Sequence, residues 1–436
     1  MLLYAHTITA RLEYIIDFIG NEILAEIITL TTDKEKFRQY TREKINYSNQ
    51  PITNEEFRIE PVGLLFENTI EDQHLQCFEY YFLKAFYKTE GDFPFDVFAA
   101  TFYLISRYEE YLPHKKDMYG RFAHEESIAF KQGFLSQPMV NTWLLELRKA
   151  LKNQFPSLMF RHRSFKFIPT YDIDIAWSYR NKGFLRNAGG FFKSIQSRKW
   201  QEANDRIEVL QEKKKDPFDC YEWLDALHLY CRLRPYYFFL LAEKTKGYDK
   251  NISPRKKALQ QLIAYQSSKG TVGIHPSWQS GDDQKLLKQE IGWMEFIIDQ
   301  PIYYSRQHYI RLTLPETYRR LMSLGITKDF SMGYGSINGF RASVASSFYW
   351  FDLEKNEKTS LLLYPFCFMD ANSFYEQQLT PREAFEELMH YYNSVKKVQG
   401  MMVTIWHNNF LGTDPQYKGW REVYEIFLKE EVYWDR

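Results

Sequence analysis

Two aspartates at the end of one apolar segment give the first sign of chemistry in this sequence. The segment "FIPTYDIDIAWSY" spans residues 167–179, and its apolar and β-branched start predicts a buried strand that ends in Asp172 and Asp174. Burying one ionised carboxylate without a partner is costly, and burying two costs more. The pair therefore predicts a site in which carboxylates meet a cation or take part in a reaction.

Other ionisable side chains stand in or at the end of later strand segments. They are His275, Arg306, His308 and His407. The carboxyl ends of parallel strands converge on one face of a barrel, and that face holds the active site. A lone histidine on a strand is usually a core residue, but several aspartates and histidines at one end of several strands indicate a site that can bind a metal.

From about residue 165 onward, apolar strand segments alternate with helical segments. The strand segments are 165–172, 234–242, 270–278, 301–312, 329–334, 361–370 and 401–409, and the helical ones include 254–268, 283–298, 315–324 and 381–398. This alternation is typical of parallel βαβ units. It predicts an α/β fold in which about seven units form a closed or nearly closed barrel.

Residues 1–160 have a different pattern, which predicts an N-terminal α+β accessory domain before a barrel domain at 161–436. In this region "RLEYIIDFIGNEIL" has helical spacing, "FRIEPVGLLFE" is typical of two short strands, and 96–112 predicts a long helix.

Two charged segments are expected to lie in solvent. The segment "SRYEEYLPHKKDMYGRF" (106–122) contains Pro113 and Gly120, which are typical of a loop. Its charged residues Arg107, Glu109, Glu110 and Lys115 are expected at a solvated helix end, and a role at a domain interface is the alternative. The stretch 180–216 is expected to be a solvated helical insertion after the first strand of the barrel.

Composition excludes several classes of protein. Lys plus Arg and Asp plus Glu both number 56, so the net charge of zero predicts no nucleic-acid partner and no attraction to an anionic membrane. The four cysteines have no CxxC spacing and are expected to stay reduced. Because no secretory signal or long apolar stretch occurs, we expect a cytoplasmic protein without membrane insertion; its oligomeric state stays open.

The motifs around these residues resemble those of the polysaccharide deacetylase family (NodB homology, carbohydrate esterase family four), and in particular a bacterial branch with an extra N-terminal domain. The resemblance covers about residues 165–430. It implies a distorted (β/α)7 barrel, a divalent metal such as zinc, cobalt, manganese or nickel, and an N-acetylated carbohydrate as the substrate.

The resemblance also implies a role for single residues. "TYDID" matches the first motif of the family, so Asp172 would be the catalytic base and Asp174 a metal ligand. "GIHPSWQ" supplies His275 as a second ligand, but Gln279 stands where the motif has its second histidine. "TIWHNN" supplies His407 as the catalytic acid.

The arginine and the third ligand are harder to assign. "SRQHY" offers Arg306 as the arginine that braces the catalytic aspartate, and "GFRAS" offers Arg341 as a second candidate. Because a catalytic zinc-type site generally has three protein ligands, and alternate residues of a strand share one face, we expect His308 to be the third ligand. The aromatic side chains expected to bind substrate are Trp278, Tyr334 and Trp406.

These residue types suit amide hydrolysis. A metal lowers the pKa of a water, a carboxylate takes its proton, and an acid protonates the leaving amine. Three alternatives stay open: a related C–N hydrolase that acts on a small non-sugar amide, a non-catalytic carbohydrate-binding barrel, and polar rim residues with a purely structural role.

Overall fold

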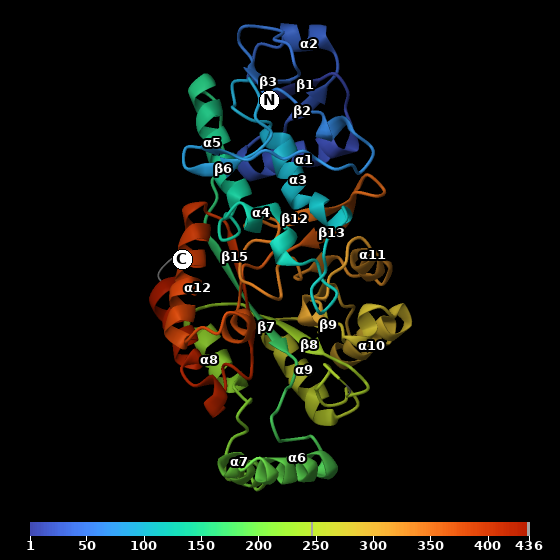
Figure 1. Cartoon of the computed structure of the whole chain (residues 1–436), viewed down its shortest axis with the longest axis vertical. Helices are drawn as coiled ribbons and strands as arrows, with labels where there is room; N and C mark the ends of the chain where they lie inside the picture. Colours follow the sequence, from blue (N-terminus) through green and yellow to red (C-terminus); the bar gives the residue numbers. More distant parts are fainter. Residues whose placement is uncertain (246, 434–436) are drawn as a thin grey trace.

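The strands from residue 166 onward form one curled sheet in this computed structural model, which describes residues 1–245 and 247–433 (Figure 1). The strand order is β12-β13-β11-β10-β9-β8-β7-β15-β14, and every neighbouring pair is parallel except β12 with β13. The strands are β7 (Lys166–Ile173), β8 (Tyr236–Leu240), β9 (Thr271–His275), β10 (Tyr304–Ser305), β11 (Lys328–Asp329), β12 (Phe348–Asp352), β13 (Glu357–Leu363), β14 (Phe368–Met369) and β15 (Met401–His407).

The α/β class is confirmed, but the sheet has nine strands and two edges within the described residues. The predicted segment 361–370 is two strands, because Pro365 has no backbone N–H to donate to a ladder. The predicted strands 301–312 and 329–334 shrink to β10 and β11, two residues each.

Helices follow most of the parallel strands and lie around the sheet (Figure 1). They are α8 (Tyr221–Tyr230), α9 (Lys257–Lys269), α10 (Gln284–Ile298), α11 (Glu316–Ser323), α12 (Pro381–Lys397) and α13 (Trp420–Ile426). The start of α12 shows why the chain turns helical: Thr380 and Glu383 form a capping box, and Pro381 occupies the first turn. The bounds of α9, α10, α11 and α12 agree closely with the four segments predicted from apolar spacing, whereas α8 and α13 were not predicted.

The two faces of the curled sheet pack against different apolar clusters. Ile168 and Phe238 belong to the smaller, inner cluster together with Val403 and Ile405, whereas their strand neighbours belong to the larger, outer one. Since alternate side chains of a strand share a face, Asp172 continues the inner row of β7. In the register of β7 with β15, His407 pairs with Asp172, so both side chains reach the same end of the inner face.

The N-terminal region has a sheet of its own with the order β2-β1-β3-β4 (Figure 1, top). The strands are β1 (Leu2–Ala5), β2 (Thr29–Thr31), β3 (Lys44–Tyr47) and β4 (Phe57–Arg58), with α1 (Ala10–Ile23) and α2 (Lys34–Gln39) between them. All three strand pairs of this sheet are parallel, whereas the hairpin that follows in the same region is antiparallel. The second strand expected in "FRIEPVGLLFE" is a 3-10 turn, Leu64–Phe66, after Gly63 at φ 106°.

The remainder of the N-terminal region includes the hairpin of β5 (Phe78–Tyr80) with β6 (Leu83–Ala85), and the helices α3 (Val97–Ile105) and α5 (Met139–Gln154). The long helix predicted for 96–112 ends at Ile105, because Arg107 adopts a left-handed conformation. Further along the chain, α6 (Phe184–Gln196) and α7 (Trp200–Leu210) form a hairpin that projects beyond the sheet (Figure 1, bottom). No helix in the described part of the chain combines the length and apolar character needed to cross a bilayer.

A buried ion-pair network joins the segment 106–122 to the C-terminal region. Glu110 accepts hydrogen bonds from Arg107 Nε at 2.7 Å and from Arg341 Nε at 2.8 Å, and Arg107 also donates to the backbone carbonyl of Arg341. Burial opposes ionisation, but Arg341 and Arg107 outweigh it and lower the pKa of Glu110 to about 2. The expectation of a solvated helix end was therefore wrong for Arg107, Glu109 and Glu110, all of which are buried.

Replacing Glu110 by Gln should destabilise the fold by about 3 to 5 kcal/mol at neutral pH, because the buried Arg341 loses its carboxylate partner and Arg107 keeps only Glu109. The folded-state pKa of Glu110, about 2, lies below its ordinary value of 4.5, so this stabilisation is present above pH 4.5 and is lost as the pH falls through 2. Urea unfolding of Glu110→Gln beside the exposed control Glu55→Gln measures it. Equal stability of the two variants at pH 7 would contradict this account.

Candidate active site

Asp172 is held by a fully buried arginine. Arg306 Nη1 donates to Asp172 Oδ1 at 2.9 Å and to Thr170 Oγ1 at 2.7 Å, and Arg306 Nε donates to the Phe330 carbonyl at 3.1 Å. The ring of Phe238 covers the guanidinium, with 4.5 Å from Cζ to the ring centroid. The charge of the guanidinium offsets the cost of burying the Asp172 carboxylate. Arg306 contacts only Oδ1 of this carboxylate, so Oδ2 has no contact with the arginine.

The backbone of Arg306 orients a second residue of the site. Its carbonyl oxygen lies 2.6 Å from His275 Nδ1. Because a carbonyl only accepts, Nδ1 must carry the proton, and the lone pair of the neutral imidazole is on Nε2. His275 Nε2 lies 3.1 Å from Asp174 Oδ1 and 3.8 Å from Asp172 Oδ2.

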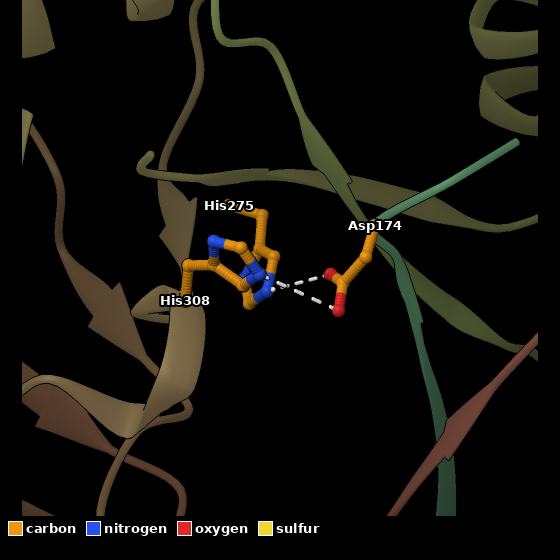
Figure 2. A group of neighbouring side chains, drawn as sticks. All are labelled: Asp174, His275 and His308. Atoms are coloured by element: carbon orange, nitrogen blue, oxygen red, sulfur yellow. Dashed lines mark ion pairs between the residues drawn. The ribbon is translucent and has the colours of Figure 1, made fainter. Parts of the chain in front are cut away.

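Asp174, His275 and His308 form a compact donor set (Figure 2). One ligand atom from each lies within 4.8 Å of the others, and Figure 2 shows both imidazoles directed at the Asp174 carboxylate. His308 Nε2 is 3.5 Å from Asp174 Oδ2. Two imidazole nitrogens and a carboxylate oxygen are the ligand types that zinc and similar divalent ions take in catalytic sites.

The Asp174 carboxylate has a place for a cation. Asp174 Oδ1 is buried and accepts no hydrogen bond from the described residues, although His275 Nε2 lies close to it. With the proton of His275 on Nδ1, its Nε2 lone pair faces a carboxylate oxygen, and either a metal ion between the two atoms or a second proton on the imidazole makes that contact favourable. Burial opposes ionisation, but the charge of His308 outweighs it and holds the pKa of Asp174 well below its usual range. The donor set therefore fits a divalent metal.

His308 is oriented by Asp249, a residue that no sequence motif indicated. His308 Nδ1 lies 3.1 Å from Asp249 Oδ1, and Asp249 is itself held by the backbone N–H of Trp278 at 2.8 Å and by Gln279 Nε2 at 3.0 Å. Burial lowers the pKa of His308, but Asp174 and Asp249 outweigh it and raise that pKa to about 9. Carboxylates commonly orient metal-binding histidines in this way. Gln279, at the position of the missing motif histidine, thus supports Asp249.

The reason given for His308 was wrong, although its side chain does reach the site. The chain leaves β10 after Ser305, and His308 begins a 3-10 turn, His308–Ile310, in which Tyr309 has φ 57°. Strand alternation therefore does not apply to Arg306 and His308. The turn still directs His308 to Asp174, while Arg306 points to Asp172.

His407 also lies near Asp174, and it is paired with Asp370, an aspartate that the motifs did not single out. Asp370 Oδ1 lies 2.6 Å from His407 Nδ1, and Asp370 Oδ2 accepts the backbone N–H of His407 at 2.7 Å. His407 Nε2 is 3.7 Å from Asp174 Oδ2. Burial opposes protonation, but Asp370 and then Asp174 raise the pKa of His407 to about 10. A carboxylate that directly follows a strand, as Asp172 does, was the available signal for Asp370.

These residues open into a cavity of about 540 Å³. Asp172, Asp174, His275, His308 and His407 line it, together with an aromatic group made of Tyr119, Tyr248 and Tyr309 and a second group made of Tyr375, Phe410 and Tyr417. Tyr119 and Arg121 come from the N-terminal region. Arg121 Nη1 donates to the Tyr309 carbonyl at 2.6 Å, so this loop is fixed to the turn that carries His308.

Five of the predicted site residues do not line the cavity; one of them, Arg306, still contacts Asp172, whereas the other four lie elsewhere. Arg341 lies in the ion-pair network of Glu110, and Tyr334 is buried there, with its hydroxyl 3.3 Å from Arg107 Nη2. Trp406 is fully buried on the outer face of β15, against Phe368, because it alternates with His407. Trp278 packs behind the cavity wall, 4.3 Å from Tyr248 between ring centroids.

Comparisons with known proteins add little to this geometry. A family of unknown function, DUF7033, matches residues 1–156. No curated protein matches the chain. A structure described as a putative polysaccharide deacetylase from Mycobacterium smegmatis aligns with a TM-score of 0.40 and 12% identity over 62% of this chain and 85% of its own. A polysaccharide deacetylase from Bacillus cereus aligns with a TM-score of 0.29 and 10% identity over 62% and 89%. At these scores the backbones agree only in part, so we base the function on the site.

The donor set predicts which variants lose metal affinity. Asp174→Asn and His308→Ala should each weaken zinc binding by more than about a hundredfold, beyond the 10–100-fold typical of residues that only orient a ligand. The loss of zinc affinity in Gln279→Ala should lie within this 10–100-fold range, because Gln279 contacts Asp249 and not the metal site itself. Isothermal titration calorimetry with zinc measures the affinities.

Asp370→Asn is the matched control for Asp174→Asn. It also replaces a carboxylate that contacts a histidine, but neither Asp370 nor His407 belongs to the donor set. Its zinc affinity should stay within about threefold of the wild type. If His308→Ala binds zinc as well as this control does, His308 is not a ligand.

Proposed function

We propose that this chain is a metal-dependent hydrolase that removes acetyl groups from N-acetylated sugars or polysaccharides. The observation that carries the proposal is the division of labour between the two aspartates that end β7. Asp172 is paired with Arg306, whereas Asp174 faces Nε2 of His275 and Nε2 of His308. One carboxylate is thus available as a base and the other as a metal ligand.

The proposed metal ligands are Asp174, His275 and His308. When bound there, a divalent ion such as zinc, cobalt, manganese or nickel would supply Lewis acidity toward the amide carbonyl and lower the pKa of a water. Asp249 and the Arg306 carbonyl fix the ring orientations of His308 and His275.

Asp172 is proposed as the general base. Its Oδ1 is held by Arg306, and its Oδ2 stays free to accept a proton from the attacking water at the cavity surface. The charge of Arg306 and its fixed contacts also hold the carboxylate in one orientation, which a base needs in order to act on a positioned water.

His407 is proposed as the general acid. Asp370 holds its Nδ1 side, so Nε2 is the atom directed at the cavity, and it lies 3.7 Å from Asp174 Oδ2. A pKa raised to about 10 by Asp370 and Asp174 keeps His407 protonated at neutral pH, ready to donate to the leaving amine. His407 returns to its charged form when it regains a proton after product release.

An N-acetylated sugar is the proposed substrate because aromatic side chains from both sides line a cavity of about 540 Å³. Residues 1–160 are proposed as an accessory domain that completes this cavity through Tyr119 and Arg121. That same contribution favours a second candidate, a small non-sugar amide, since the loop narrows the access that a long polysaccharide needs.

The proposed activity predicts metal-dependent release of acetate. Purified protein loaded with zinc or cobalt should release acetate from at least one member of a panel of N-acetylhexosamines and their oligomers, and a chelator should abolish this release. Release from small non-sugar amides alone would support the second candidate. No release from any substrate by metal-loaded protein would contradict both.

The assignment of the base predicts a separation of rate from metal binding. Asp172→Asn should lower kcat by about 10²–10⁴-fold while zinc content stays at the wild-type level, since Asp172 is not a ligand. Asp174→Asn should lose both zinc and activity. A rate within threefold of the wild type for Asp172→Asn would mean that another group is the base.

A further inference from the structure

The hairpin of α6 and α7 has a polar seam between its two helices. Asn187 and Ser194 are the buried residues of α6. Asn187 Oδ1 accepts from Arg206 Nη1 at 3.3 Å, and the Ser194 hydroxyl lies 3.0 Å from Glu202 Oε1. At Gly190, a Cβ would meet the Arg206 guanidinium at 2.5 Å. Both buried residues of α6 are therefore polar, and they contact Arg206 and Glu202 of α7.

The apolar side chains of α6 lie on another face and recur at helical spacing: Phe184, Leu185, Ala188, Phe191, Phe192 and Ile195. Ala188, Phe191 and Ile195 are half-buried, whereas the other three are exposed. Phe184 is 83% exposed, Leu185 85% and Phe192 68%, and Trp200 at the start of α7 is 62% exposed. A helix of a globular protein normally turns such a face to the core, and a cluster of exposed apolar side chains indicates an interaction surface.

The same segment is strongly basic. Residues 180–201 contain six basic side chains and no Asp or Glu: Arg180, Lys182, Arg186, Lys193, Arg198 and Lys199. Over 180–216 there are ten Lys and Arg against five Asp and Glu, in a chain whose net charge is zero. The expectation of no attraction to an anionic membrane followed from the charge of the whole chain, in which the excess of basic residues in this segment is balanced by acidic residues elsewhere.

We propose that the hairpin of α6 and α7 docks on an anionic phospholipid bilayer. Phe184, Leu185 and Phe192 enter the headgroup region, and the basic side chains before and after α6 meet lipid phosphates. A helix with Phe and Leu on one face and Lys and Arg beside it lies in the plane of the interface, about 5–10 Å deep. Such a helix lies on the membrane and does not span it.

A bilayer fits this surface better than a second copy of the chain. Two hairpins packed face to face would bring two sets of cations together without an acidic partner in residues 180–201, and like charges oppose association. Lipid phosphates supply the opposite charge, and the acyl boundary accepts the apolar side chains.

Docking would bring the cavity to the membrane surface. α6 follows the end of β7, the strand that carries Asp172, and Arg186 Nη2 donates to the carbonyl of Lys250 at 3.1 Å. Lys250 lines the cavity. A substrate held at the membrane would then be within reach; this consequence rests on the proposed function, whereas the docking itself does not depend on catalysis.

Co-sedimentation of the full chain with phosphatidylcholine vesicles, with and without phosphatidylglycerol, tests the docking. The wild type should bind only the vesicles that contain phosphatidylglycerol, and salt should weaken binding. The triple variant Phe184→Ser, Leu185→Ser, Phe192→Ser should bind at least about tenfold more weakly. The matched control Ile27→Ser, Leu229→Ser changes side chains that are 84% and 82% exposed elsewhere and should bind like the wild type.

Three outcomes would overturn the docking: no binding of the wild type to phosphatidylglycerol vesicles at low salt, equal binding by the triple variant, or equal loss in the control. A wild-type dimer in light scattering that the triple variant dissociates would also overturn it, because a second copy would then cover the face. A thermal unfolding midpoint of the triple variant that equals that of the wild type would show that the variant is folded. None of these readouts requires hydrolytic activity.

Discussion

The arrangement of the site depends on one buried charge, the guanidinium of Arg306. Its side chain holds Asp172 and Thr170 on β7 and the carbonyl of Phe330 after β11, so it fixes three segments of the curled sheet around one point. Its backbone carbonyl accepts from His275 Nδ1, which determines that the free nitrogen of this imidazole faces Asp174. One residue thereby orients the proposed base and one proposed ligand, and losing it would leave a buried carboxylate without a partner.

The features that could be predicted from the sequence are those that local pattern and parallel topology determine. Helical spacing predicted α9 to α12 well, and apolar strands ending in polar residues brought Asp172, Asp174, His275 and His407 to one end of the sheet. These side chains meet because the carboxyl ends of parallel strands meet. Their proposed roles stay predictions, and His308 reached the site through a turn that no strand pattern describes.

The features that could not be predicted depend on contacts between distant segments. Asp249 orients His308 from a loop, where a single carboxylate has no distinctive spacing. Asp370 directly follows β14, so its place at a strand end could be predicted, but its contact with His407 could not. Arg341 was chosen from a short motif, but its partner Glu110 lies far away in the sequence. The exposure of the apolar residues of α6 could not be predicted either. The spacing of apolar residues predicts an apolar helix face, but it does not show whether the protein core covers that face.

X-ray absorption spectroscopy of the zinc-loaded protein tests the central claim most directly, because it reports the atoms bound to the metal. The account predicts one zinc per chain with two imidazole nitrogens at about 2.0–2.1 Å and carboxylate oxygen in its first shell. His275→Ala and His308→Ala should each remove one imidazole from the spectrum, and Asp172→Asn should leave it unchanged. A spectrum that loses a ligand in Asp172→Asn, or keeps both imidazoles in His308→Ala, would contradict the account.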